Sequence, residues 1–175
     1  MPIRYCFDNT FNAAQLAAVK LGLSDATDAW SRVARITFQH VSGLDGASCT
    51  QGQTGKDIVV TKAPDTGSAG TFPGQVLQQL IMSTTATQGV FLHELGHVLG
   101  FGHEQFHSKS GLGCTVVVPP VPSLFGVVYA DLNPEWDPAS VMQYYNNDGQ
   151  PSCDGGTSMV NLSAGDGDGA RALYP

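Results

Sequence analysis

Three histidines and one glutamate carry the clearest chemistry in the sequence. His93 and His97 are four positions apart, Glu94 directly follows the first, and His103 lies six positions after the second. On an α-helix, side chains four positions apart lie on the same face, about 6 Å from each other along the axis. Both imidazoles can therefore bind one metal ion, and the carboxylate of Glu94 can act as a general base on a water at that metal.

A glycine explains how the third histidine reaches the same metal. Glycine adopts the left-handed conformation that ends helices without a Cβ penalty, so Gly100 allows a sharp turn that brings His103 back. Three neutral imidazoles leave a fourth position for water. This open coordination is expected of a catalytic zinc ion, whereas structural zinc sites are closed. We therefore expect one Zn²⁺.

The ligand helix is expected to be buried, because its other faces are apolar. These faces carry Phe91, Leu92, Leu95, Val98 and Leu99. The histidine pair should then face out of the core into a cleft. Thr85, followed three positions later by Gln88, predicts a capping box at the start of this helix.

The extended pattern H-E-x-x-H-x-x-G-x-x-H, from His93 to His103, resembles the metzincin zinc metallopeptidases. Glu104, directly after the third histidine, resembles the astacin branch of that group. The resemblance implies a secreted zinc endopeptidase that acts on proteins or peptides, with Glu94 as general base. In astacins the amino group of the mature chain pairs with the glutamate that matches Glu104. Only five residues precede Cys6 here, so we expect Glu104 to need another partner.

A second segment extends the resemblance. Residues 140–144, Ser-Val-Met-Gln-Tyr, resemble the Met-turn of astacins. By that match Met142 forms an apolar floor beneath the zinc ligands, where its role is packing. Tyr144 is then a weak fifth ligand or a donor to the tetrahedral intermediate, and Tyr145 is the competing candidate.

The resemblance also implies the fold and the place of the substrate. We expect an α+β, metzincin-type catalytic domain with a twisted, mainly parallel mixed sheet and two long helices in about residues 1–100. An irregular part, about residues 101–175, should end in a helix, with zinc in the cleft between the two. In metzincins the strand before the zinc helix forms a rim that pairs with substrate. The rim residues would be Leu77, Gln78, Gln79, Leu80, Ile81 and Met82.

A chain of 175 residues is long enough to form a hydrophobic core and short enough to be one domain. Local patterns predict its remaining helices and strands. Asn12 with Gln15 predicts a helix start, and apolar residues at spacings of three and four continue to Val33, with a break possible at Gly22 or Ser24. Ser163 with Asp166 predicts the cap of a last helix that ends at 173–174. Strands are predicted at 4–7, 35–41, 57–61 and 78–83, and a loop at 64–74.

Four cysteines, Cys6, Cys49, Cys114 and Cys153, allow three disulfide connectivities. We favour Cys6–Cys49 with Cys114–Cys153, because each pair then stays within one half of the chain. Two disulfides indicate an oxidising compartment; the alternative is four buried free thiols in a cytosolic protein. No signal peptide pattern is visible at the N-terminus, so we suspect that a leader and a pro-segment are missing.

The charge distribution limits the classes of molecule that the protein is expected to bind. The net charge is −7, and no lysine or arginine occurs between Gly111 and Ala170. Nucleic acid and anionic membranes are therefore not expected as partners, and no apolar run is long enough to span a membrane. We expect a monomer. Astacin-like enzymes often favour acidic side chains just after the cut; without a nearby cation, neutral or basic side chains are expected here.

Several alternatives remain open at the level of sequence. His40 and His107 are further candidate ligands, although His40 is better explained as a strand histidine. Asp166 and Asp168 suggest calcium, or more simply a capped turn. The chain could belong to another metzincin branch such as the matrixins, or be a non-catalytic, zinc-stabilised binding module.

Overall fold

The computed structural model describes residues 1–63, 78–114, 132–153 and 156–175. Its strands are β1 (Ile3–Phe7), β2 (Phe38–His40), β3 (Ile58–Lys62), β4 (Gln78–Met82), β5 (Tyr144–Tyr145) and β6 (Pro151–Ser152). Its helices are α1 (Ala13–Val33), α2 (Gln88–Val98) and α3 (Ala164–Leu173), with short 3₁₀ turns η1 (Ser42–Leu44), η2 (Gly46–Ser48) and η3 (Glu104–Phe106).

The first four strands form one sheet in the order β2-β1-β3-β4, and all three of its pairings are parallel. Parallel strands are normally covered by helices, and both Val60 and Leu80 are buried here. The predicted α+β architecture with a mainly parallel sheet is confirmed. Among the described residues the only antiparallel pairing of strands is β5 with β6, in a separate sheet.

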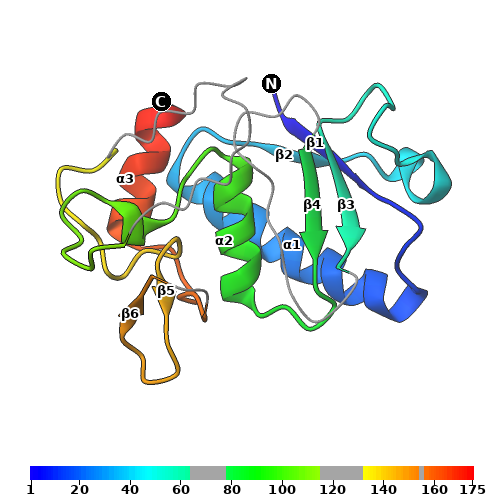
Figure 1. Ribbon diagram of the computed structural model, residues 1–175. Coiled ribbons are helices and arrows are strands. Elements are labelled where there is room, and N and C mark those ends of the chain that lie inside the picture. Colours follow the sequence, from blue (N-terminus) through cyan, green and yellow to red (C-terminus); the bar gives the residue numbers. More distant parts are fainter. Residues whose placement is uncertain (64–77, 115–131, 154–155) are drawn as a thin grey trace.

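Helix α2 lies between this sheet and the C-terminal elements. Figure 1 shows the sheet on one side of α2, and α3 with the β5–β6 hairpin on the other. Helix α1 runs behind the sheet and packs against both α2 and α3. The helix that carries two candidate ligands is therefore held on several sides.

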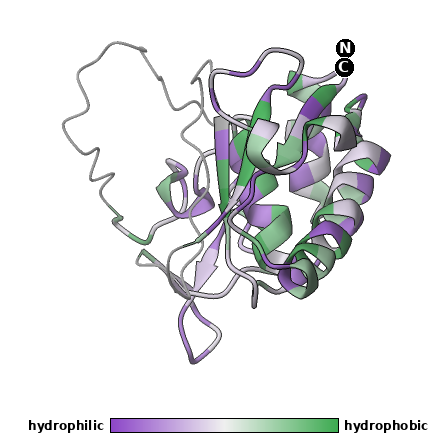
Figure 2. Ribbon diagram, turned by 90° about the vertical axis from the view of Figure 1, so that its right-hand side faces the viewer, coloured by the Kyte–Doolittle hydropathy of each residue, from purple (hydrophilic) through white to green (hydrophobic). Residues whose placement is uncertain are grey.

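Helix α1 begins as predicted, with a capping box between Asn12 and Gln15. The predicted break at Gly22 or Ser24 is wrong, because the helix runs unbroken to Val33. A Cβ on Gly22 would lie 2.3 Å from the ring of Phe91, so close packing of α1 on α2 requires glycine there. Figure 2 shows both hydrophobic and hydrophilic residues along the helices. The buried residues of α1 recur at helical spacing, as expected of an amphipathic helix: Val19, Leu23, Ala26, Thr27 and Trp30.

Two other predicted boundaries shift. Strand β2 spans only Phe38–His40 of the predicted 35–41, because it pairs with just three residues of β1. Helix α2 begins at Gln88 with Thr87 as N-cap, so the predicted start at Thr85 is wrong. The hydroxyl of Thr85 instead lies 3.0 Å from that of Ser83. The capping box of Ser163 and Asp166 at the start of α3 is confirmed.

Trp30 of α1 connects the hydrophobic core to α2. Trp30 of α1 is fully buried, and its indole N–H donates to the carbonyl of Leu92 at 3.1 Å. Its ring stacks on Phe101, with ring centroids 5.3 Å apart. These two contacts fix α1 against the segment that carries the candidate ligands.

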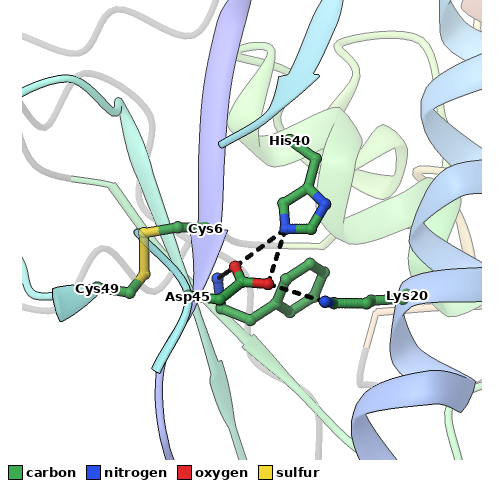
Figure 3. Close-up of polar contacts among 6 residues, drawn as sticks. Cys6, Lys20, His40, Asp45 and Cys49 are labelled. Carbon is green, nitrogen blue, oxygen red and sulfur yellow. Dashed lines mark hydrogen bonds and ion pairs between the residues drawn. A yellow bond between two sulfur atoms is a disulfide. The ribbon is translucent and has the colours of Figure 1, made fainter. Parts of the chain in front are cut away.

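Both favoured disulfides are confirmed, Cys6–Cys49 and Cys114–Cys153. Next to the first of them, Asp45 accepts hydrogen bonds from the N–H of Phe7, Nζ of Lys20 and Nε2 of His40 (Figure 3). Asp45 thereby ties the turns after β2 to β1 and α1, and His40 is a structural residue. In the described part of the chain, no helix combines the length and apolarity needed to cross a membrane.

Candidate metal centre

Helix α2 places two imidazoles and one carboxylate together. His93, Glu94 and His97 lie in its second half, and the helix ends at Val98 with Leu99 as C-cap. Gly100 follows with a φ of +99°, in the left-handed region predicted for it. The turn then carries the chain to His103, directly before η3.

The three imidazoles converge. One ring nitrogen of each of His93, His97 and His103 lies within 4.8 Å of the other two. Nε2 of His97 and Nε2 of His103 are 3.0 Å apart, and Nε2 of His93 is buried without a hydrogen-bond partner. Tetrahedral zinc with Zn–N bonds of about 2.0–2.1 Å needs nitrogens roughly 3.4 Å apart. The donor set and its unpaired buried nitrogen therefore fit one zinc ion.

In two of the three imidazoles, a backbone carbonyl holds the opposite ring nitrogen. Nδ1 of His93 lies 2.7 Å from the carbonyl of Val141, and Nδ1 of His97 lies 2.9 Å from that of Phe101. These bonds place the proton on Nδ1 and leave Nε2 free for a metal. Burial lowers the pKa of His93 and of His103 to about 3, and it also lowers the pKa of His97. The imidazoles are therefore neutral, as metal ligands must be.

Glu94 is suited to accept a proton. Its side chain is buried, and Oε2 has no hydrogen-bond partner. Burial raises its pKa to about 7. A carboxylate in such surroundings has the basicity that general-base catalysis near neutral pH requires.

Tyr144, and not Tyr145, lies against the ligands. Its ring stacks on His93 at a centroid distance of 4.9 Å and lies 4.6 Å from the ring of His103. Burial, together with the nearby Glu94, raises the pKa of Tyr144 to about 12, so its hydroxyl stays protonated. The backbone of Tyr145 pairs with Thr157 instead.

Met142 lies directly beneath the ligand helix. It is 1% exposed, and a Cβ on Gly96 would lie 2.3 Å from its Sδ. Glycine at position 96, between the two helical ligands, therefore allows the methionine to pack there. Gly96 was not predicted as a site residue, although a glycine inside a helical pattern often has a packing reason.

The carboxylate of Glu104 has a hydrogen-bond partner, as expected from the sequence. Its Oε1 accepts from the N–H of Asp137 at 2.8 Å, and its own N–H donates to the carbonyl of Met142 at 3.0 Å. Burial raises its pKa. His107 lies near Asn133, with Nε2 3.0 Å from that carbonyl, and is not part of the histidine cluster.

The expected substrate rim falls on β4, which is an edge strand of the described sheet. Leu80 and Met82 point into the core, whereas Gln79 and Ile81 are partly exposed. Gln78 opens the strand, and Leu77 lies outside the described residues. The structure thus provides an edge at this place, and its pairing with substrate stays a prediction.

One further residue, Asp166, was not assigned to the site from the sequence. Asp166 was predicted only as a helix cap or calcium ligand, yet its carboxylate accepts from Ser140 Oγ at 2.6 Å and from Val141 N–H at 3.0 Å. Both partners lie in the Met-turn. A cavity of about 240 Å³ is lined by His103, Met142 and Asp166, among other residues.

Comparisons with family models and with curated proteins find no match. Solved structures do resemble the chain. A structure of myroilysin matches all of this chain and 93% of its own, with a TM-score of 0.64 and 21% identity. High choriolytic enzyme 1, a hatching enzyme zinc-protease from the medaka fish Oryzias latipes, matches over 98% of this chain and 88% of its own, with a TM-score of 0.58 and 20% identity. These likenesses show that the chain shares the fold of these two proteins, and they bear out the predicted α+β architecture.

Proposed function

We propose that this chain is a zinc-dependent endopeptidase that hydrolyses peptide bonds in proteins or peptides. One zinc ion would be held by His93, His97 and His103. The observation that carries the proposal is the convergence of three neutral imidazoles beside Glu94, a buried carboxylate with an unpaired oxygen. The fold shared with a zinc-protease supports it.

Each residue has a distinct task in this mechanism. Zinc, when bound, lowers the pKa of water and polarises a carbonyl group. Oε2 of Glu94 accepts the proton of the attacking water and passes it to the leaving amine. The hydroxyl of Tyr144 donates to the oxyanion that develops on the scissile carbonyl. No covalent intermediate with the protein is formed.

Tyr144→Phe tests the donor role against a matched control, Tyr145→Phe. Loss of one oxyanion donor should lower kcat by about a hundredfold, with KM little changed. The control removes the hydroxyl of the neighbouring tyrosine, which does not stack on the ligands, and should stay within twofold of the wild type. Equal effects of the two substitutions would remove Tyr144 from the mechanism.

The substrate would add a strand to the outer edge of β4. Such pairing gives affinity through the backbone, so side-chain preference depends on pockets and charge. Residues 101–175 contain two lysine or arginine residues against eight aspartates and glutamates, and so carry −6 of the total charge of −7. Both cations are paired, Lys109 with Glu135 at 2.6 Å and Arg171 with Asp168 at 2.5 Å.

We therefore expect neutral or basic side chains, and not acidic ones, just after the cut. The net negative charge of residues 101–175 should repel acidic peptides and attract basic ones, and the effect should weaken with salt. Profiling the cleavage of a mixed peptide library at low and high ionic strength measures this preference. Enrichment of Asp or Glu at that position would overturn it while leaving the endopeptidase assignment intact.

We infer the compartment from the disulfides. Cys6–Cys49 and Cys114–Cys153 form and persist in oxidising surroundings, which supports a secreted, extracellular enzyme. We propose that it acts as a monomer. Size-exclusion chromatography with light scattering checks the oligomeric state.

The same fold could serve as a zinc-stabilised binding module. A structural zinc site is closed by four protein ligands. The described cluster has three, with an unpaired carboxylate beside it, and this arrangement favours catalysis. Metal analysis that finds about one zinc per chain, together with hydrolysis of a quenched fluorescent peptide, tests the assignment. A folded, zinc-loaded chain without hydrolysis would favour the binding module.

A further inference from the structure

We propose that Asp166, in the first turn of α3, is a positioning residue for the zinc site. It holds the backbone of the Met-turn, and that backbone holds His93 and the segment that follows His103. The inference rests on the zinc site proposed above and extends it to a helix distant in sequence.

Both carboxylate oxygens of Asp166 are used outside the helix. Oδ1 accepts from the hydroxyl of Ser140 at 2.6 Å, and Oδ2 accepts from the N–H of Val141 at 3.0 Å. The side chain is buried, with the whole residue 5% exposed. These bonds join α3 to a segment 25 and 26 residues earlier in the chain.

The Met-turn passes this restraint to two ligand-bearing segments. The carbonyl of Val141 accepts from Nδ1 of His93 at 2.7 Å. The carbonyl of Met142 accepts from the N–H of Glu104, the residue after His103, at 3.0 Å. Ser140 Oγ, held by Asp166, in turn accepts from the N–H of Met142 at 3.0 Å. Asp166 thus reaches His93 through one residue.

A carboxylate is required at this position because every partner is a donor. Besides Ser140 and Val141, the N–H of Ser163 donates to Oδ2 at 2.8 Å. An asparagine would turn an NH₂ group toward one of these donors and leave a buried N–H or hydroxyl without its acceptor. Hydrogen bonds to an ionised acceptor are also the stronger ones.

Helix capping alone does not explain these contacts. The capping box needs only the reciprocal bonds between Ser163 and Asp166. The bonds to the Met-turn are additional, and they distinguish Asp166 from Asp168 two positions on, which pairs with Arg171 on the surface. The two roles can therefore be separated by substitution.

Zinc affinity, measured by competition with a chromophoric chelator, separates them. Asp166→Asn should weaken zinc binding by about 10- to 100-fold, the usual effect of losing support behind a ligand. Ser163→Ala removes the cap hydroxyl, which bonds the N–H of Asp166 and Oδ2 of Asp137 but no residue of the Met-turn. It should lower the unfolding free energy, while zinc affinity falls much less than in Asp166→Asn. Ser140→Ala, which removes the bridging hydroxyl, should weaken zinc binding in the same direction as Asp166→Asn.

The outcomes are distinguishable. A folded Asp166→Asn protein with wild-type zinc affinity, or with a loss no larger than that of Ser163→Ala, would overturn the inference. If Asp166→Asn does not fold, Ser140→Ala decides: wild-type affinity in that variant also overturns it. A wild-type chain that binds no zinc would instead overturn the proposed function. Peptide hydrolysis is not needed for any of these readings.

Discussion

Gly96→Ala provides a quantitative test of the packing beneath the metal centre. Gly96 lies between His93 and His97 on α2, and the side chain of Met142 lies under it. An added Cβ would be 2.3 Å from Sδ of Met142 and 3.4 Å from Cζ2 of Trp30. The contact with Trp30 is tolerable. The contact with Sδ is not, because non-bonded heavy atoms need roughly 3.5 Å or more, so the sulfur must move by more than about 1 Å.

Two opposing terms set the magnitude. Overpacking a filled core costs about 1–3 kcal/mol, and alanine is favoured over glycine inside a helix by about 1 kcal/mol. Gly96→Ala should therefore lower the unfolding free energy of the wild type by about 1 kcal/mol. In a Met142→Ala background the clash is gone, so the same substitution should raise it by up to about 1 kcal/mol.

A double-mutant cycle measures the difference. Urea unfolding of the wild type, both single variants and the double variant at one fixed zinc concentration gives the four free energies. The coupling between positions 96 and 142 should be about 1–3 kcal/mol, with the two substitutions compensating each other. An effect of Gly96→Ala that agrees in both backgrounds within about 0.5 kcal/mol would refute the packing argument.

Three other predictions concern stability. Gly100→Ala should cost about 1–2 kcal/mol in urea unfolding through backbone strain alone, because φ is +99° and nothing lies within 4 Å of the new Cβ; an unchanged midpoint would contradict this. Trp30→Phe should cost about 1–3 kcal/mol in thermal unfolding, since it opens a small cavity and removes an indole hydrogen bond to α2. Burial raises the pKa of Asp45, but hydrogen bonds from Lys20, His40 and a backbone N–H outweigh it and hold that pKa below its ordinary value. The stabilisation from Asp45 is therefore present above its unfolded pKa of about 3.9 and is lost as pH falls through the lower folded value. Asp45→Asn should make the loss of unfolding free energy with falling pH less steep in that range. Parallel plots of unfolding free energy against pH for the wild type and the variant would argue against this.

The histidine cluster could be predicted because its geometry is local. His93, Glu94 and His97 are related by one helical turn, and Gly100 supplies the positive φ that ends the helix. The third ligand, His103, follows within the same short segment. A reader of the sequence therefore needs no knowledge of how distant segments pack.

The support behind the ligands could not be predicted, because it comes from contacts between distant segments. The spacing of Ser163 and Asp166 predicts a helix cap, and the cap is present. Nothing in that spacing says that the same carboxylate also reaches Ser140 and Val141. Every residue has a backbone carbonyl, so the sequence cannot indicate that the carbonyl of Val141 is the acceptor.

Two predicted helix boundaries were wrong for different reasons. Gly22 suggested a break in α1, but it permits the ring of Phe91 to approach the helix. Thr85 suggested the start of α2, but its hydroxyl is engaged with that of Ser83, and the helix begins three residues later. The reason for Gly22 thus lies in another helix, whereas Thr85 is engaged in a contact two residues away.

Hydrolysis of casein by the purified chain tests the central claim most directly, with Glu94→Ala and a zinc chelator as controls. Glu94 is not a metal ligand in this site, so the variant should still hold about one zinc per chain. We predict proteolysis by the wild type that is abolished by the chelator, restored by added zinc and absent in zinc-loaded Glu94→Ala. Two results would contradict the account. One is a zinc-loaded Glu94→Ala variant that cleaves casein as fast as the wild type, and the other is a folded, zinc-loaded wild type that cleaves nothing.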